Sequence, residues 1–165
     1  MSNLEWAYNT LTISTLHDDK KEALDLFYLK EELTDLDDNS PLTFFTHIPI
    51  PEILIETAGK TDEFTRDTNV GMTGFACITE YTIKNWGCPT DANDVKVSEP
   101  TEHELNYTFR TRSACPIVWA KELSAQYPDL MIELESTNEF ELWDDFEVVF
   151  INGKEVVHEY KKKQR

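Results

Sequence analysis

Acidic side chains are the commonest reactive groups in this chain, and one run of them imitates a calcium-binding loop. Asp35, Asp37 and Asn39 alternate as the first three ligands of such a loop do. However, Pro41 stands at the seventh position, Thr46 replaces the bidentate glutamate at the twelfth, and the sixth position is not glycine. A capped helix end is the better interpretation, so we expect no calcium site and no cofactor.

Histidine and cysteine give no stronger indication of a catalytic or metal site. The histidines are scattered, and none has a partner at the spacing of zinc ligands: His17, His47, His103 and His158. The cysteines form no CxxC pair, which is typical of free thiols in a reducing compartment: Cys77, Cys88 and Cys115. Neither a phosphate-binding glycine loop nor a nucleophile elbow is present. A Cys–His pair assembled in space is the enzymatic alternative, but the sequence predicts a protein that is not an enzyme.

Net charge is more informative than these motifs. The 165 residues include 32 acidic and 15 basic side chains, for a formal net charge of −17. Four of the basic side chains lie in a basic tail over 161–165, so the body is more acidic than the total indicates. Such acidity disfavours direct binding to nucleic acid or to anionic membranes and favours a basic partner. The alternative is that the acidity serves solubility alone.

No targeting or membrane-spanning segment is recognisable in the sequence. The N-terminus lacks a basic segment followed by an apolar run, and no stretch approaches the roughly 20 apolar residues that span a bilayer. We therefore expect the protein to work in the cytoplasm.

The elements that position these side chains follow from hydrophobic periodicity. Alternating β-branched residues predict a strand over 10–15, and leucines at helical spacing predict a helix over about 18–35. The apolar run 43–48 predicts a second strand. Three glycines and mixed charge predict a loop or insertion over 57–74, and a helix is expected over 75–86.

The second half of the chain alternates more clearly. Strands are predicted around Val95–Val97, over Leu105–Thr111 and over Leu130–Leu134, with a helix from Pro116 to Tyr127 between the last two. Two further strands flank Asn152-Gly153, a strong hairpin signal.

Counting back from this turn gives a predicted register for the hairpin. Val149 is then paired with Val156, and Glu147 with His158. This register predicts an ion pair between Glu147 and His158.

The order of these elements predicts an α+β fold. Helices would pack on one face of an antiparallel sheet, as in ferredoxin-like domains, with an insertion and a C-terminal β-hairpin added. We expect one domain over 1–160, followed by the basic tail.

Tryptophan could supply a surface for stacking bases, but the individual positions favour other roles. Trp119 lies with Ala120, Leu123 and Tyr127 on one stripe of the helix predicted from Pro116 to Tyr127, and it is expected in the core. Asn85-Trp86-Gly87 is typical of a helix end with the indole packed inward and the glycine in a left-handed turn. Trp143 lies among acidic residues, where it suits core packing or a protein-facing anchor.

Several short motifs of the chain occur together in one known family. They are Glu5–Ile13, with its tryptophan and Leu-Thr-Ile strand, Asn85-Trp86-Gly87 followed by Asp91, and Tyr107–Thr111 followed by Pro116 and Tyr127–Leu130. In these the chain resembles the YubB-type ferredoxin-like domains carried by phages and plasmids, although Cys88 and Pro89 depart from the family pattern. The resemblance implies a ferredoxin-like fold and residence in a mobile genetic element, and it supplies no catalytic residues.

Charge and resemblance together lead to two functional hypotheses. The first is a phage or plasmid inhibitor of anti-CRISPR or anti-restriction type, which mimics nucleic acid in the basic groove of a host defence protein. The second is an accessory protein of the mobile element that forms a homodimer through a sheet edge. The residues expected to bind the partner are Asp35, Asp37, Asp38, Glu133, Glu135, Glu139, Glu141, Trp143, Asp144 and Asp145.

Overall fold

The computed structural model describes residues 6–16, 24–25, 27, 40–98, 101, 103–138 and 145–161. The strands are β1 (Trp6–Thr15), β2 (Asn93–Val97), β3 (Glu104–Arg112), β4 (Leu130–Asn138), β5 (Asp145–Ile151) and β6 (Lys154–Lys161). The helices are α2 (Phe44–His47), α3 (Glu52–Glu56), α4 (Glu63–Thr73), α5 (Ile78–Asn85) and α6 (Ile117–Gln126).

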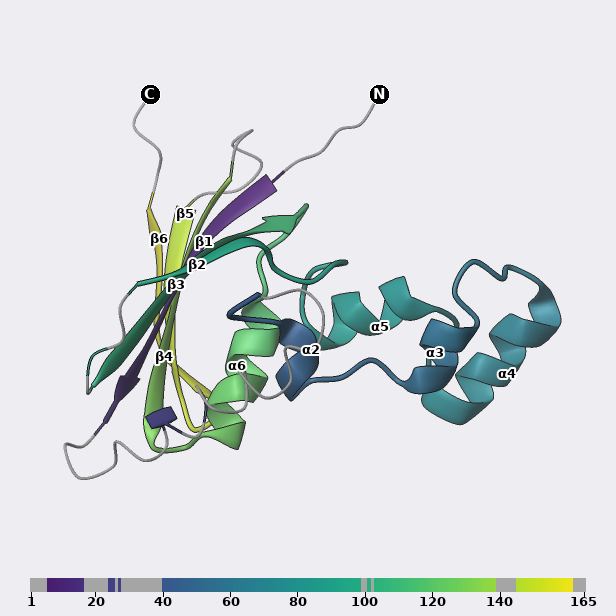
Figure 1. The fold of residues 1–165 in the computed structure, drawn as a ribbon, viewed down its shortest axis with the longest axis horizontal. Coiled ribbons are helices and arrows are strands. Elements are labelled where there is room, and N and C mark those ends of the chain that lie inside the picture. Colours follow the sequence, from purple (N-terminus) through teal and green to yellow (C-terminus); the bar gives the residue numbers. More distant parts are fainter. Residues whose placement is uncertain are drawn as a thin grey trace.

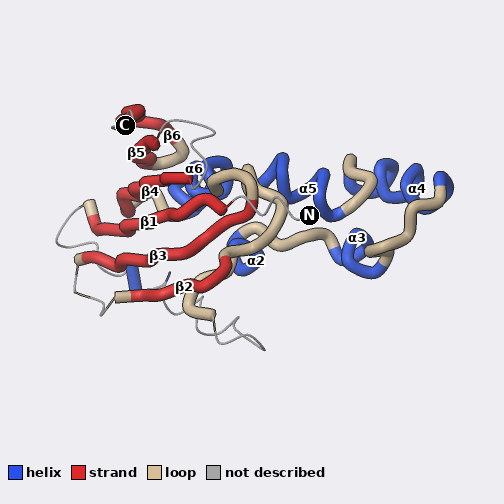
Figure 2. Tube along the Cα trace, turned by 90° about the horizontal axis from the view of Figure 1, so that it is seen from above, coloured by secondary structure: helices blue, strands red, loops and turns tan. Residues whose placement is uncertain are grey.

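The strands form one antiparallel sheet in the order β2-β3-β1-β4-β5-β6. The described helices all lie on the same side of this sheet, and α3 and α4 lie farthest from it (Figures 1 and 2). The first four strands have the β2-β3-β1-β4 order of a ferredoxin-like sheet, to which the β5–β6 hairpin adds two strands. The predicted α+β fold is confirmed.

The core lies between the sheet and helix α6. On β1, Leu11 and Ile13 are buried while Thr10 and Thr12 are only partly covered, so alternation along the strand separates the two faces. The predicted stripe of α6 is also confirmed, because Trp119 and Leu123 are fully buried. Helix α6 therefore covers one face of the sheet and leaves the other open.

The strand predicted over 43–48 is wrong, because Phe44–His47 forms helix α2. The Thr43 hydroxyl accepts a hydrogen bond from the Thr46 amide. The carboxylate of Asp91 accepts from the amides of Phe44 (2.7 Å) and Phe45 (3.2 Å). These acceptors satisfy amides that have no partner within the helix. The capping carboxylate is distant in sequence, so local strand propensity could not reveal this helix.

The loop predicted over 57–74 is also wrong, because most of the segment is helix α4. Asp62 caps its first turn by accepting from the Thr65 amide at 3.0 Å, and Gly74 ends it in a left-handed conformation with φ of 86°. Both signals are present in the sequence. Gly71 lies inside the helix and does not break it.

The β5–β6 hairpin forms as predicted at Asn152-Gly153, but its predicted register is wrong. A bulge between Val149 and Phe150 shifts the pairing, so that Val149 lies opposite Val157 and Glu147 opposite Glu159. His158 is paired with Val148. The expected Glu147–His158 ion pair therefore has no basis in the register.

The Asn85-Trp86-Gly87 motif ends helix α5 as predicted. Trp86 is buried, and its indole N–H donates to the carbonyl of Ile48 at 3.0 Å. Gly87 has φ of 92°, and a Cβ placed there would lie 3.1–3.3 Å from backbone atoms of Cys115 and of Ile117 and Val118, the first two residues of α6. The motif thus packs the end of α5 against the start of α6, and glycine is required by both conformation and space.

Candidate functional site

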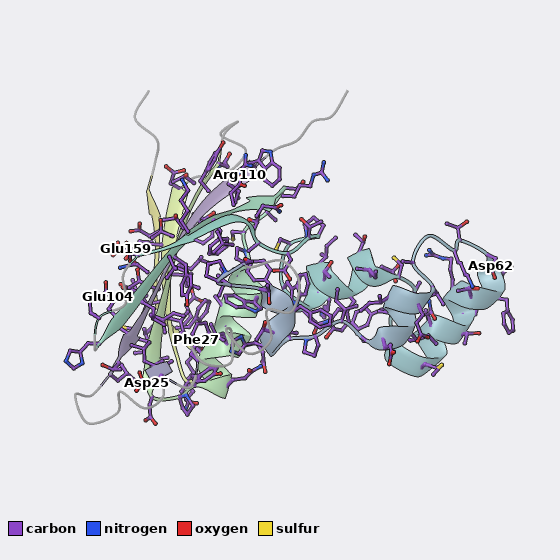
Figure 3. All side chains as sticks on the ribbon, viewed as in Figure 1. Asp25, Phe27, Asp62, Glu104, Arg110 and Glu159 are labelled. Atoms are coloured by element: carbon purple, nitrogen blue, oxygen red, sulfur yellow. The ribbon has the colours of Figure 1, made fainter. Side chains whose placement is uncertain are left out.

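The open face of the sheet, opposite to α6, gathers polar side chains from every strand. Alternation places Tyr8, Thr10 and Thr12 of β1 on this face, and cross-strand pairing aligns residues of the other strands with them. In Figure 3, Glu104 and Glu159 project from the side of the sheet away from the helices, whereas Phe27 lies between sheet and helices. The face is therefore accessible over the described residues.

One half of this face carries an acidic stripe, which we define as Glu133, Glu135, Glu147 and Glu159. Glu135 lies directly opposite Glu147 in the β4–β5 pair, and Glu147 lies directly opposite Glu159 in the β5–β6 pair. Directly opposed Cβ atoms in antiparallel strands are about 4.5–5.5 Å apart, and like charges in such positions destabilise the sheet. Three glutamates thus form a row of like charge across three neighbouring strands.

The pKa of Glu133 reflects the negative charge of the stripe. Partial burial raises the pKa of its carboxyl group above the ordinary value of 4.5, and the nearby carboxylates of Glu147, Glu104 and Glu135 raise it further. The ionised form is thus disfavoured both by loss of water and by repulsion. The stripe is a region of concentrated negative potential.

Glu133→Gln is expected to flatten the dependence of stability on pH. Between 4.5 and the raised pKa of Glu133, the folded protein binds more protons than the unfolded chain, so this residue makes stability rise as the pH falls. Glutamine removes that contribution. Urea denaturation at low salt, from about pH 7 to about pH 5, measures the slope. Identical slopes for wild type and Glu133→Gln would contradict the expectation.

The other end of the open face carries aromatic and arginine side chains. The guanidinium of Arg110 lies 4.5 Å from the ring centroid of Trp6 and forms an ion pair with Asp94. Tyr8 lies directly opposite Arg110 and is 42% exposed. Aromatic and arginine side chains are typical of binding hot spots, so this end adds stacking surfaces to the charge of the stripe.

The structure brings together only part of the predicted partner-binding set. Glu133 and Glu135 lie on the open face, as does Asp145 by alternation with Glu147 along β5. The others lie outside the described residues: Asp35, Asp37, Asp38, Glu139, Glu141, Trp143 and Asp144.

The residues predicted from the sequence to bind a partner do not include three glutamates of the open face: Glu104, Glu147 and Glu159. Alternation along each strand marks the face on which these residues lie. The cross-strand neighbours of Glu147 and Glu159, however, depend on the bulge, and the sequence does not reveal the bulge.

Neither buried thiol suits nucleophilic chemistry. Burial raises the pKa of Cys115 to about 11, and burial with nearby negative charge raises the pKa of Cys88 as well. The thiolate is the reactive form of cysteine, so these shifts work against reactivity. His47 is also a core residue, with its ring stacked on Phe27 at 4.8 Å and its Nε2 3.0 Å from the Tyr127 hydroxyl.

The described residues offer neither a metal-binding cluster nor a membrane-spanning helix. No group of three or more histidine, cysteine, aspartate or glutamate side chains there could hold a metal ion. None of the helices in the same part of the chain is long and apolar enough to cross a membrane.

Comparison with known proteins adds a likeness in fold. No protein-family model and no curated protein sequence matches the chain. Among solved structures, the chain is similar to the crystal structure of protein api92 from Yersinia pseudotuberculosis, which is assigned to the family DUF1281. The TM-score is 0.53 with 11% sequence identity, and the match covers 98% of this chain and 99% of that chain. At this identity, the likeness shows that the two chains share a fold over nearly their whole length.

Proposed function

We propose that this chain is a non-enzymatic binding protein whose acidic stripe occupies the basic, nucleic-acid-binding groove of another protein. The observation that carries this proposal is the row formed by Glu135, Glu147 and Glu159. A sheet optimised for stability alone would not place three like charges directly opposite one another. Departures from local sheet preferences of this kind are expected at functional surfaces.

The spacing of the row suits mimicry of a nucleic-acid backbone. Neighbouring strands lie about 4.7–4.9 Å apart, so the row carries one negative charge in each such interval. A single strand of B-DNA carries one charge per about 3.4 Å of helix axis. The row is less densely charged than one DNA strand, but it presents a short line of negative charge to a groove lined with lysine and arginine. The same charges disfavour direct binding of this chain to nucleic acid.

The biological setting of the proposal comes from the motifs of the chain. Their resemblance to YubB-type domains supports an origin in a phage or plasmid. A basic, nucleic-acid-binding host protein would then be a defence enzyme of CRISPR or restriction type, and inhibition would take place in the host cytoplasm.

Features of β6 disfavour the alternative of a homodimer built on the sheet edge. The strand contains a bulge, and its register with Phe150 places the exposed Glu155 on the helix-covered side of the sheet. Bulges and charges directed inward are devices that prevent edge strands from pairing. Glu159 adds a further negative charge to this edge.

Capture from a bacterial lysate at two salt concentrations tests the proposal. Immobilised wild-type protein is expected to retain basic, nucleic-acid-binding proteins at about 50 mM salt and to lose them at about 500 mM, because salt screens exposed charges. Mass spectrometry identifies the retained proteins. The mimicry proposal would be contradicted if the amount of retained protein did not change with salt over this range. Retention of partners without a basic nucleic-acid groove would contradict it as well.

A further inference from the structure

Beside the acidic stripe, the open face has a hollow of about 420 Å³. Threonines from three strands line this hollow: Thr10, Thr108 and Thr137. Tyr8, which lies opposite Thr137, and Glu135, which lies opposite Thr10 and is the first glutamate of the acidic row, also line the hollow. Aromatic, hydroxyl and carboxylate groups thus converge on one space, which is large enough for a long side chain.

Charge is distributed unevenly around the hollow. Glu135 lies on β4, next to Glu147 on β5, whereas Lys96 lies on β2, three strands away from Glu135 and thus at about 14 Å. Arg110 and Asp94 also line the hollow, and they form an ion pair with each other. The β4 side is therefore the negative side of the hollow, and the acidic stripe continues from it.

The open face already binds one arginine side chain of the chain itself, that of Arg110. Trp6 and Tyr8 are two residues apart on β1 and share the open face. The guanidinium of Arg110 lies 4.5 Å from the centroid of the Trp6 ring and is paired with the carboxylate of Asp94. Tyr8 and Glu135, which also line the hollow, supply a second aromatic ring and a second carboxylate on this face.

We propose that the hollow binds an arginine side chain of the basic partner, with the guanidinium over the Tyr8 ring and its N–H groups directed to Glu135 and the threonine hydroxyls. A planar guanidinium carries five donors and stacks on aromatic rings, whereas a lysine ammonium is a compact point charge. The hollow therefore adds selectivity for arginine to the unselective attraction of the stripe. This inference rests on the proposed function, because the stripe must first attract a basic partner.

Two synthetic peptides of equal length and charge, one of arginine and one of lysine, test the inference on the full chain. By titration calorimetry at about 50 mM salt, we expect both to bind, with the arginine peptide about fivefold to twentyfold tighter. Tyr8→Ala is expected to remove the preference and to leave the affinity for the lysine peptide within about twofold of wild type. Phe64→Ala, which removes an exposed aromatic side chain on the distant helix α4, is the matched control and should keep the preference.

The outcomes separate the two proposals. Equal affinities for the two peptides, both weakened by salt, would overturn the arginine site and leave the mimicry proposal standing, as would a preference that survives Tyr8→Ala. Failure of both peptides to bind would overturn the two proposals together. Adenosine monophosphate is the probe for an anionic ligand instead, and saturable binding of it that requires Tyr8 and Lys96 would also overturn the arginine site.

Discussion

Replacing Trp86 by alanine is expected to lower the free energy of unfolding by about 3–5 kcal/mol. The side chain is only 2% exposed and meets Phe44 edge-to-face, with ring centroids 5.6 Å apart. Its indole N–H donates to the carbonyl of Ile48, which lies next to helix α2. The substitution therefore leaves a large cavity where α2, α5 and α6 meet, and it leaves a buried carbonyl without its donor.

Urea denaturation followed by far-ultraviolet circular dichroism measures this loss. Ile83→Ala, in the last turn of helix α5 before Trp86 but 52% exposed, is the matched control and should cost less than about 1 kcal/mol. A loss at Trp86 no larger than that at Ile83 would contradict the central place of the Asn85-Trp86-Gly87 motif in the core.

Neutralising the acidic row is expected to weaken partner binding at least about a hundredfold at low salt, because close charge pairs across interfaces couple strongly. The same variant should be slightly more stable than wild type, since the opposed like charges no longer repel. A gain in stability with a loss of binding separates a functional surface from a folding defect. The substitutions are Glu135→Gln, Glu147→Gln and Glu159→Gln.

A second triple variant, on α3 and α4, provides the matched control. It removes the same number of charges away from the sheet: Glu52→Gln, Glu56→Gln and Glu63→Gln. Calorimetry with a partner identified from the lysate measures both variants, and denaturant unfolding measures their stability. Equal losses of affinity would mean that net charge, and not the row, determines binding.

Hydrophobic periodicity along the sequence predicts the elements that are determined by their own residues. Helix α6 and strands β1 and β3 have clear periodicity, and each forms close to where the sequence places it. Helix α2 could not be predicted in this way, since its amides are capped by Asp91, more than 40 residues along the chain. Helix α4 is not predicted, because the glycines of that segment favour a loop. Asp62 and Gly74 nevertheless mark its two ends in the sequence.

The candidate site was only partly predictable for a related reason. Acidic composition and strand alternation are enough to place Glu133 and Glu135 together on one face. The row itself depends on which residues of β5 and β6 lie opposite each other, and a single bulge changes that register. Sequence periodicity predicts the face of a side chain but not its neighbour on the next strand.

Competition with DNA tests the nucleic-acid mimicry most directly. The complex between this protein and a partner captured at about 50 mM salt is titrated with double-stranded DNA that the partner binds, and its composition is followed by analytical ultracentrifugation. Binding through the acidic stripe predicts mutual exclusion, with DNA displacing this protein and neutralisation of the row making displacement easier. A stable ternary complex of partner, DNA and this protein would contradict occupation of the nucleic-acid groove.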